Sequence, residues 1–138
     1  MELASNIIAA ISVLVAGLTF VFDKIVARKQ RTIEKLIELR TFYHDSIAGN
    51  KNKKEDDYYR KCVKFFGNVE ELCSGAFTGY YSQSVIKKNG SRFITMLYNN
   101  YKEYLIDQRR AQFHNDDYYQ NLENLVKKFD KKRGAKNV

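Results

Sequence analysis

The chain has 138 residues, and 24 Lys and Arg against 16 Asp and Glu give it a formal net charge of +8. Two cysteines are too few for a disulfide-stapled secreted domain or a four-cysteine zinc module. The chain contains no proline, which favours long uninterrupted helices, and its length suits one domain.

The first predicted element is a helix over residues 3–22, a run of twenty residues without a charged side chain. A helix of that length measures about 30 Å, the thickness of the hydrocarbon core of a bilayer. No basic residue precedes the run and no clear cleavage site follows it, which argues against a signal peptide. A buried core helix is the alternative, but the rest of the chain is too small to cover it on every side. We therefore expect residues 1–22 to form a transmembrane anchor.

Basic residues follow this anchor directly and predict its orientation. Positively charged flanks stay on the cytoplasmic side of a membrane and lie against its anionic lipids. The sequence thus predicts a single-pass protein of the bacterial inner membrane, with its N-terminus outside and its C-terminal domain in the cytoplasm. The two free thiols agree with a reducing compartment. The residues expected to face the anionic inner leaflet are Lys24, Arg28, Lys29 and Arg31.

Small residues recur within the anchor at helical spacing. Ala9, Ser12 and Ala16 lie at i, i+3 and i+7, so they share one helix face. A face of small side chains lets two transmembrane helices approach closely. We call it the small-residue face, and it predicts association of the chain into a homo-oligomer.

The remaining periodicity is helical throughout, so the predicted fold class is all-α. Residues 23–49 continue the anchor as a juxtamembrane helix. Residues 50–126 form a small cytoplasmic helical domain, with a helix from Asp56, a break over residues 74–79, at most a short helical turn over 82–88, and a long helix from Ser91 to about 110. A last helix starts at Asn115 or Asp116, and residues 127–138 hold its end and a basic tail.

The sequence offers few residues that could bind a metal ion or act in catalysis. His44 and His114 have no carboxylate or cysteine at metal-ligand spacing. Cys62 and Cys73 lie eleven residues apart in one predicted helix, too far to form a disulfide, and no base accompanies either as a nucleophile. The sequence therefore predicts no catalytic, cofactor-binding or metal-binding residue and no cofactor.

Two neighbouring carboxylates, Glu70 and Glu71, stand out because they interrupt an apolar stretch. A partly buried acid in such a place more often pairs with a cation than acts as a general base. We expect a structural ion pair between Glu71 and either Arg109 or Arg110 at the end of the long helix. Catalysis by Glu71 is the alternative.

The order of these segments resembles a large bacterial family of single-pass, membrane-anchored, all-helical proteins that share a domain without an assigned function. The likeness rests on the stretches FFGNVEELCSGAF, YKEYLIDQRR and DDYYQNLENLVKKF. Asn68 and Glu71 match positions of the family pattern, whereas Val69 and Glu70 depart from its aromatic preference. The resemblance implies a membrane-anchored helical domain and brings no activity, substrate or cofactor.

These observations lead to two hypotheses about function. The first is a non-enzymatic interaction or regulatory module, tethered to the membrane and acting on a cytoplasmic protein partner. The alternative is an oligomerising membrane effector of the abortive-infection or phage-defence type, which acts through its single span. The basic tail carries no nucleic-acid reader motif, which argues against a nucleic-acid partner.

Overall fold

The computed structural model describes residues 1–48, 55–111 and 118–136, with side chains for 1–48, 56–108 and 118–131. Its elements are α1 (Glu2–Phe42), the π-helical turn η1 (Tyr43–Ala48), α2 (Glu55–Thr78), α3 (Gln83–Asn89), α4 (Ser91–Ala111) and α5 (Gln120–Lys136). No strand occurs in these three ranges. The predicted all-α fold, a long apolar N-terminal helix followed by a small helical bundle, is confirmed.

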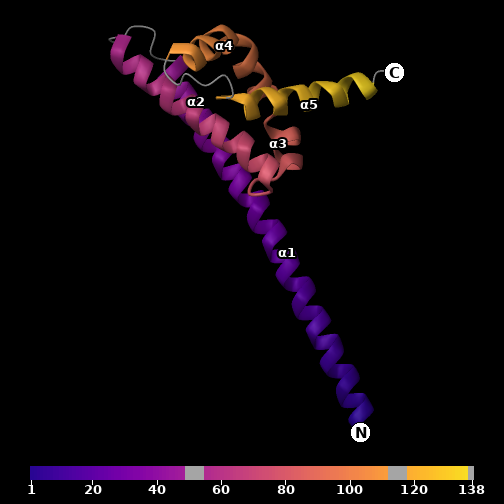
Figure 1. Cartoon of the computed structure of the whole chain (residues 1–138). Coiled ribbons are helices and arrows are strands. Elements are labelled where there is room, and N and C mark those ends of the chain that lie inside the picture. The colour runs from indigo at the N-terminus through magenta and orange to yellow at the C-terminus, as the bar shows by residue number, and fades with distance from the viewer. Residues whose placement is uncertain (49–54, 112–117, 137–138) are drawn as a thin grey trace.

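Helix α1 consists of two halves in different surroundings. All residues from 1 to 27 are exposed, whereas Thr32, Leu36 and Leu39 are buried against the other helices. Figure 1 shows the first half as a bare rod that projects from the bundle, with the N-terminus at its far end. No break separates the two halves, so the rod and the bundle share one continuous helix.

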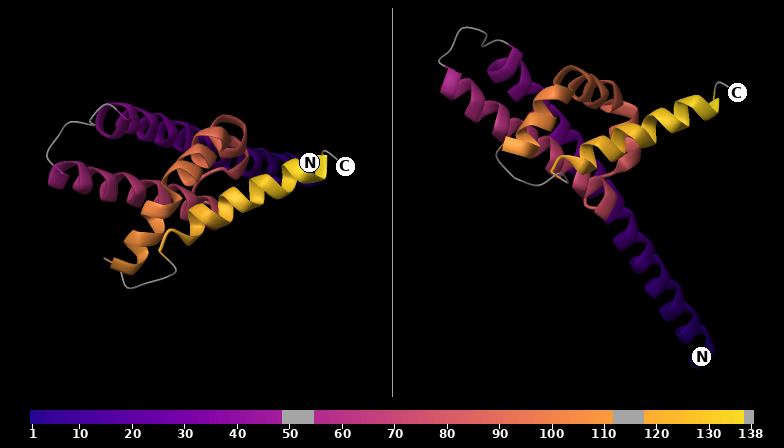
Figure 2. Two further views of the ribbon diagram at one scale, coloured as in Figure 1. Left: turned by 90° about the horizontal axis from the view of Figure 1, so that it is seen from above. Right: turned by 45° about the horizontal axis from the view of Figure 1, so that its top comes forward.

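Helix α2 runs alongside the second half of α1, as both views of Figure 2 show. The predicted break at residue 74 is wrong, because the helix continues to Thr78. Gly75 lies within it, and a Cβ there would collide with the ring of Tyr81. The glycine therefore makes room for a buried tyrosine, while Gly79, at a φ of +84°, follows the last residue of the helix.

Helices α3 and α4 follow each other with one residue between them. The Ser82 hydroxyl accepts a hydrogen bond from Val85 N at 3.4 Å and caps α3, which is a helix of seven residues where a short turn was expected. Gly90 separates the two helices, and a Cβ there would lie 2.7 Å from Cδ2 of Leu36. The corner between α3 and α4 thus packs directly on α1.

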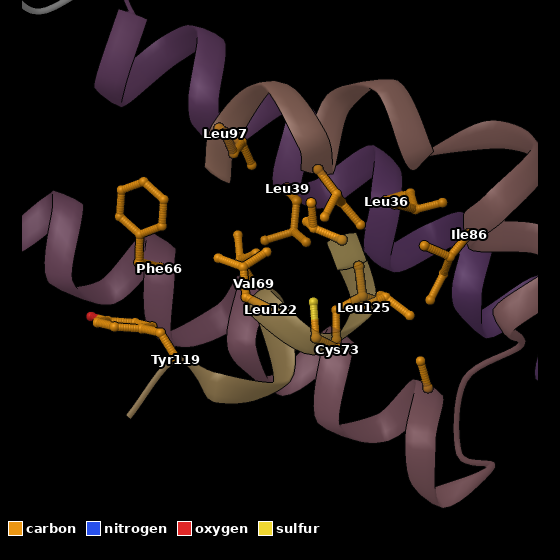
Figure 3. Close-up of a cluster of buried hydrophobic side chains, with 14 of the residues drawn as sticks. Leu36, Leu39, Phe66, Val69, Cys73, Ile86, Leu97, Tyr119, Leu122 and Leu125 are labelled. Atoms are coloured by element: carbon orange, nitrogen blue, oxygen red, sulfur yellow. The ribbon is translucent and has the colours of Figure 1, made fainter. Parts of the chain in front are cut away.

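Helix α5 lies across α2 and completes the core (Figures 1 and 2). The predicted start at Asn115 or Asp116 lies outside the described residues, and α5 begins at Gln120. Figure 3 shows apolar side chains from α1, α2, α3, α4 and α5 gathered in one cluster, and the labelled ones are at most 2% exposed. Its labelled members besides Phe66 and Tyr119 are Leu36, Leu39, Val69, Cys73, Ile86, Leu97, Leu122 and Leu125.

Candidate functional site

The exposed half of α1 is an apolar surface that the bundle leaves uncovered. Among the described helices, α1 is the one that is long and apolar enough to cross a membrane. Its apolar side chains point outward on every side, and the bundle buries none of those between residues 1 and 27. Soluble proteins rarely expose so large an apolar surface, so this half of the helix is a candidate membrane span.

The small-residue face lies on this exposed half. Ala9, Ser12 and Ala16 are all exposed. The Ser12 hydroxyl donates a hydrogen bond to the Ile8 carbonyl oxygen at 2.9 Å, so its polar group is satisfied within the helix. The bundle leaves this face open to another helix.

A cleft lies where α1 enters the bundle. It has a volume of about 330 Å³. Figure 1 shows the turn between α2 and α3 beside α1 at this point. The structure brings together three of the four cations predicted to face lipid, whereas Lys29 does not line the cleft. The lining residues are Lys24, Ala27, Arg28, Arg31, Gly79 and Tyr80.

Hydrogen bonds fix the wall of this cleft. Arg31 Nη1 donates to the Tyr80 carbonyl oxygen at 3.1 Å, and its Cζ lies 4.1 Å from the centroid of the Tyr80 ring. One residue further on, Thr32 Oγ1 accepts from Ser82 N at 2.8 Å, a contact between buried groups. The turn is thus attached to α1 at two successive positions, and the Arg31 side chain is held in place.

Glu71 does not lie where the sequence suggested. Its side chain is 60% exposed, and its carboxylate lies 3.6 Å from Lys35 Nζ. The expectation of a partly buried acid is therefore wrong for this residue. The side chains of Arg109 and Arg110 lie outside the described residues, so their pairing with Glu71 stays a prediction.

Glu70 is the half-buried acid instead, and it caps helix α5. Its two carboxylate oxygens accept hydrogen bonds from Asn121 N at 3.0 Å and from Leu122 N at 2.9 Å. The first N–H groups of a helix have no partner within that helix, and they carry its positive dipole end. A carboxylate from α2 thus stabilises the start of α5. The apolar residues around Glu70 indicated from the sequence that this acid is partly buried. They did not indicate that it contacts the start of α5.

The two thiols lie in the core and are free. Burial raises the pKa of Cys73 well above its ordinary value, and the negative charge of Glu70 raises it further. Burial also raises the pKa of Cys62, against a hydrogen bond with Tyr58 that lowers it. Since the thiolate is the reactive form of cysteine, both residues serve as small core side chains.

The remaining candidates for metal binding are spread along the chain. His44 is exposed in η1, and His114 lies outside the described residues. Within the ranges that the structure covers, no group of three or more His, Cys, Asp or Glu side chains is placed to hold a metal ion.

One family model matches this chain, described as a domain of unknown function (DUF4760), over residues 6–129. The match covers most of the sequence, so the chain belongs to this family. No curated protein and no solved structure matches it. The resemblance to a family whose shared domain has no assigned function is confirmed to that extent, while a bacterial source and a single membrane pass stay predictions.

Proposed function

We propose that this member of the DUF4760 family is a non-enzymatic membrane tether that holds a helical interaction or regulatory module against the cytoplasmic face of the bacterial inner membrane. The observation that carries the proposal is the division of α1 into an exposed apolar half and a half buried in the bundle, without a break between them. A continuous helix transmits the position and tilt of the span to the bundle. The module is thereby held close to the lipid surface.

The charge on either side of the span supports the orientation. Glu2 is the one charged side chain before the apolar run, while four cations follow within nine residues of its end. Such cations resist crossing the membrane, so the bundle stays on the side where the chain is made. The cytoplasm also keeps Cys62 and Cys73 reduced, as the structure has them.

The tether is tested by alkaline carbonate extraction of membranes that contain the full chain. Replacing residues 3–22 with twenty alternating leucines and alanines should leave the protein resistant to extraction, since any apolar helix of that length anchors equally well. A variant of the unmodified chain with Ile11→Arg and Leu14→Arg should lose this resistance, because each central arginine costs about 2.5–3.5 kcal/mol. Extraction of the unmodified protein, or resistance of the arginine variant, would overturn the tether.

A second candidate, the oligomerising effector, is favoured by an apolar seam along α1. Val26, Ile33 and Ile37 are exposed beyond the predicted span. They continue the small-residue face in a seven-residue register, the pattern of a helix pair that supercoils. Asp23 and Gln30 fall in the same register, and polar residues at such positions weaken the pairing. We therefore place this function second.

The two candidates differ in what induction does to the cell. For a tether, induction of the full chain leaves growth and membrane potential unchanged. For an effector, induction collapses the potential, and Ser12→Leu with Ala16→Leu abolishes the effect by blocking close approach. The control is Ala10→Leu with Gly17→Leu, which adds the same side chains on another face of the helix. Growth arrest that the control retains and that Ser12→Leu with Ala16→Leu abolishes would replace the tether by the effector.

A further inference from the structure

The cleft at the base of the bundle holds three cations without acidic partners. In the part of the chain that the structure describes, Lys24, Arg28 and Arg31 form no ion pair with a carboxylate. Lys35, one turn above Arg31, lies 3.8 Å from Glu38 and 3.6 Å from Glu71. Lys35 thus has acidic partners on the bundle side, whereas the three cations of the cleft have none among the described residues.

The position of the cleft places these cations at or just beyond the lipid headgroups if residues 3–22 span the bilayer. With a rise of about 1.5 Å per residue, the backbones of Lys24, Arg28 and Arg31 lie about 3, 9 and 14 Å beyond the end of the span. The headgroup layer occupies roughly the first 5–8 Å outside the hydrocarbon core. Helical side chains lean toward the N-terminus, so those of Arg28 and Arg31 reach back toward the bilayer.

The opposite wall of the cleft suits the same layer. Tyr80 is 54% exposed, and tyrosine is enriched at the boundary between lipid and water. Its ring and its carbonyl oxygen both hold the Arg31 guanidinium, which leaves the remaining N–H groups of that arginine free to meet an anion. The wall is therefore formed before any ligand arrives, which reduces the cost of binding.

We propose that this cleft is a binding site for the phosphate of an anionic phospholipid headgroup. Arg28 and Arg31 donate hydrogen bonds to the phosphate oxygens, a task that suits the planar guanidinium, and Lys24 adds its charge at the hydrocarbon boundary. The volume of about 330 Å³ is sufficient for one headgroup. The proposal rests on the proposed membrane span. It adds a defined lipid-binding site to the general attraction between the basic residues after the span and anionic lipids.

The test is a lipid titration of the full chain in neutral detergent micelles, followed by native mass spectrometry. The probes are phosphatidylglycerol, phosphatidylcholine with the same acyl chains, and inorganic phosphate in large molar excess. The variants are Arg28→Gln and Arg31→Gln, and Lys29→Gln is the control, because it removes the same charge from a neighbouring residue outside the cleft. Far-UV circular dichroism shows that each variant keeps its helices.

We expect one phosphatidylglycerol to bind in preference to phosphatidylcholine, and to bind about tenfold more weakly in each cleft variant than in the Lys29 control. An equal loss in the control would overturn the site in favour of diffuse surface charge. Displacement of the lipid by inorganic phosphate would overturn the lipid as ligand and assign the cleft to a soluble phosphate. If the proposed membrane span itself is wrong, the carbonate extraction described above shows it independently, because the unmodified protein would then be released from the membrane.

Discussion

Replacing Glu70 should destabilise the bundle far more than replacing its neighbour Glu71. The Glu70 carboxylate accepts two backbone hydrogen bonds at the start of α5, at 3.0 and 2.9 Å. In Glu70→Gln the amide keeps one acceptor oxygen, but the negative charge and one of the two hydrogen bonds are lost. The variant therefore tests whether a carboxylate from α2 holds α5 in place.

The size of the effect follows from the groups involved. A hydrogen bond to a charged group contributes about 1.5–3 kcal/mol, and a negative charge at a helix N-terminus contributes about 0.3–1 kcal/mol. Because one neutral hydrogen bond survives and the site is half-buried, we expect Glu70→Gln to lower the free energy of unfolding by about 1–2 kcal/mol. Glu70→Ala, which leaves both N–H groups without the carboxylate, should lower it by about 2–3 kcal/mol.

Glu71→Gln is the matched control, with the same chemical change one residue along. This carboxylate is 60% exposed and lies 3.6 Å from Lys35 Nζ, an arrangement that contributes little. We expect a loss below about 0.5 kcal/mol. The assay is urea unfolding of the full chain in detergent micelles, followed by far-UV circular dichroism because the chain has no tryptophan. Equal losses in Glu70→Gln and Glu71→Gln, or no loss in either, would refute the reasoning.

Further substitutions test the packing of the bundle in the same assay. Gly75→Ala should lower stability by about 1–3 kcal/mol because its methyl group would lie against the Tyr81 ring, whereas Gly67→Ala, with nothing within 4 Å, should raise it by about 0.5–1 kcal/mol. Tyr104→Phe should raise stability by about 1 kcal/mol, because in the described part of the chain its buried hydroxyl has no hydrogen-bond partner. Burial also raises the pKa of Tyr104, so above about pH 10 the unfolded chain loses this proton more readily than the folded one, and the free energy of unfolding falls as the pH rises. Unfolding curves at a series of alkaline pH values should show that the free energy of unfolding falls less in Tyr104→Phe than in the unmodified protein.

Local sequence patterns were sufficient to predict the fold class and the long apolar helix. The apolar spacing of residues such as Leu36 and Leu39 repeats within one element, so it can be read without knowing the partner helix. The start of α4 at Ser91 and the start of α2 near Asp56 were also signalled locally. Gly75 misled the prediction, because its role is to admit Tyr81 and not to end a helix.

The contacts that form the candidate site join residues far apart in the chain. Arg31 meets Tyr80 across 49 positions, Thr32 meets Ser82 across 50, and Glu70 meets Asn121 across 51. Such pairs leave no periodic trace in a single sequence. Even so, the apolar stripe of α2 places Glu70 nearer its buried edge than Glu71, and that difference was available from the sequence.

The measurement that tests the central claim most directly is labelling of single introduced cysteines with a membrane-impermeant maleimide in spheroplasts. The native thiols are buried and so should stay unlabelled in the folded protein. The account predicts that Glu2→Cys is labelled in intact spheroplasts, whereas Lys131→Cys, at an exposed position of α5, is labelled only after the membrane is permeabilised. Labelling of Lys131→Cys in intact spheroplasts, or protection of both positions, would contradict a single span that places the bundle in the cytoplasm.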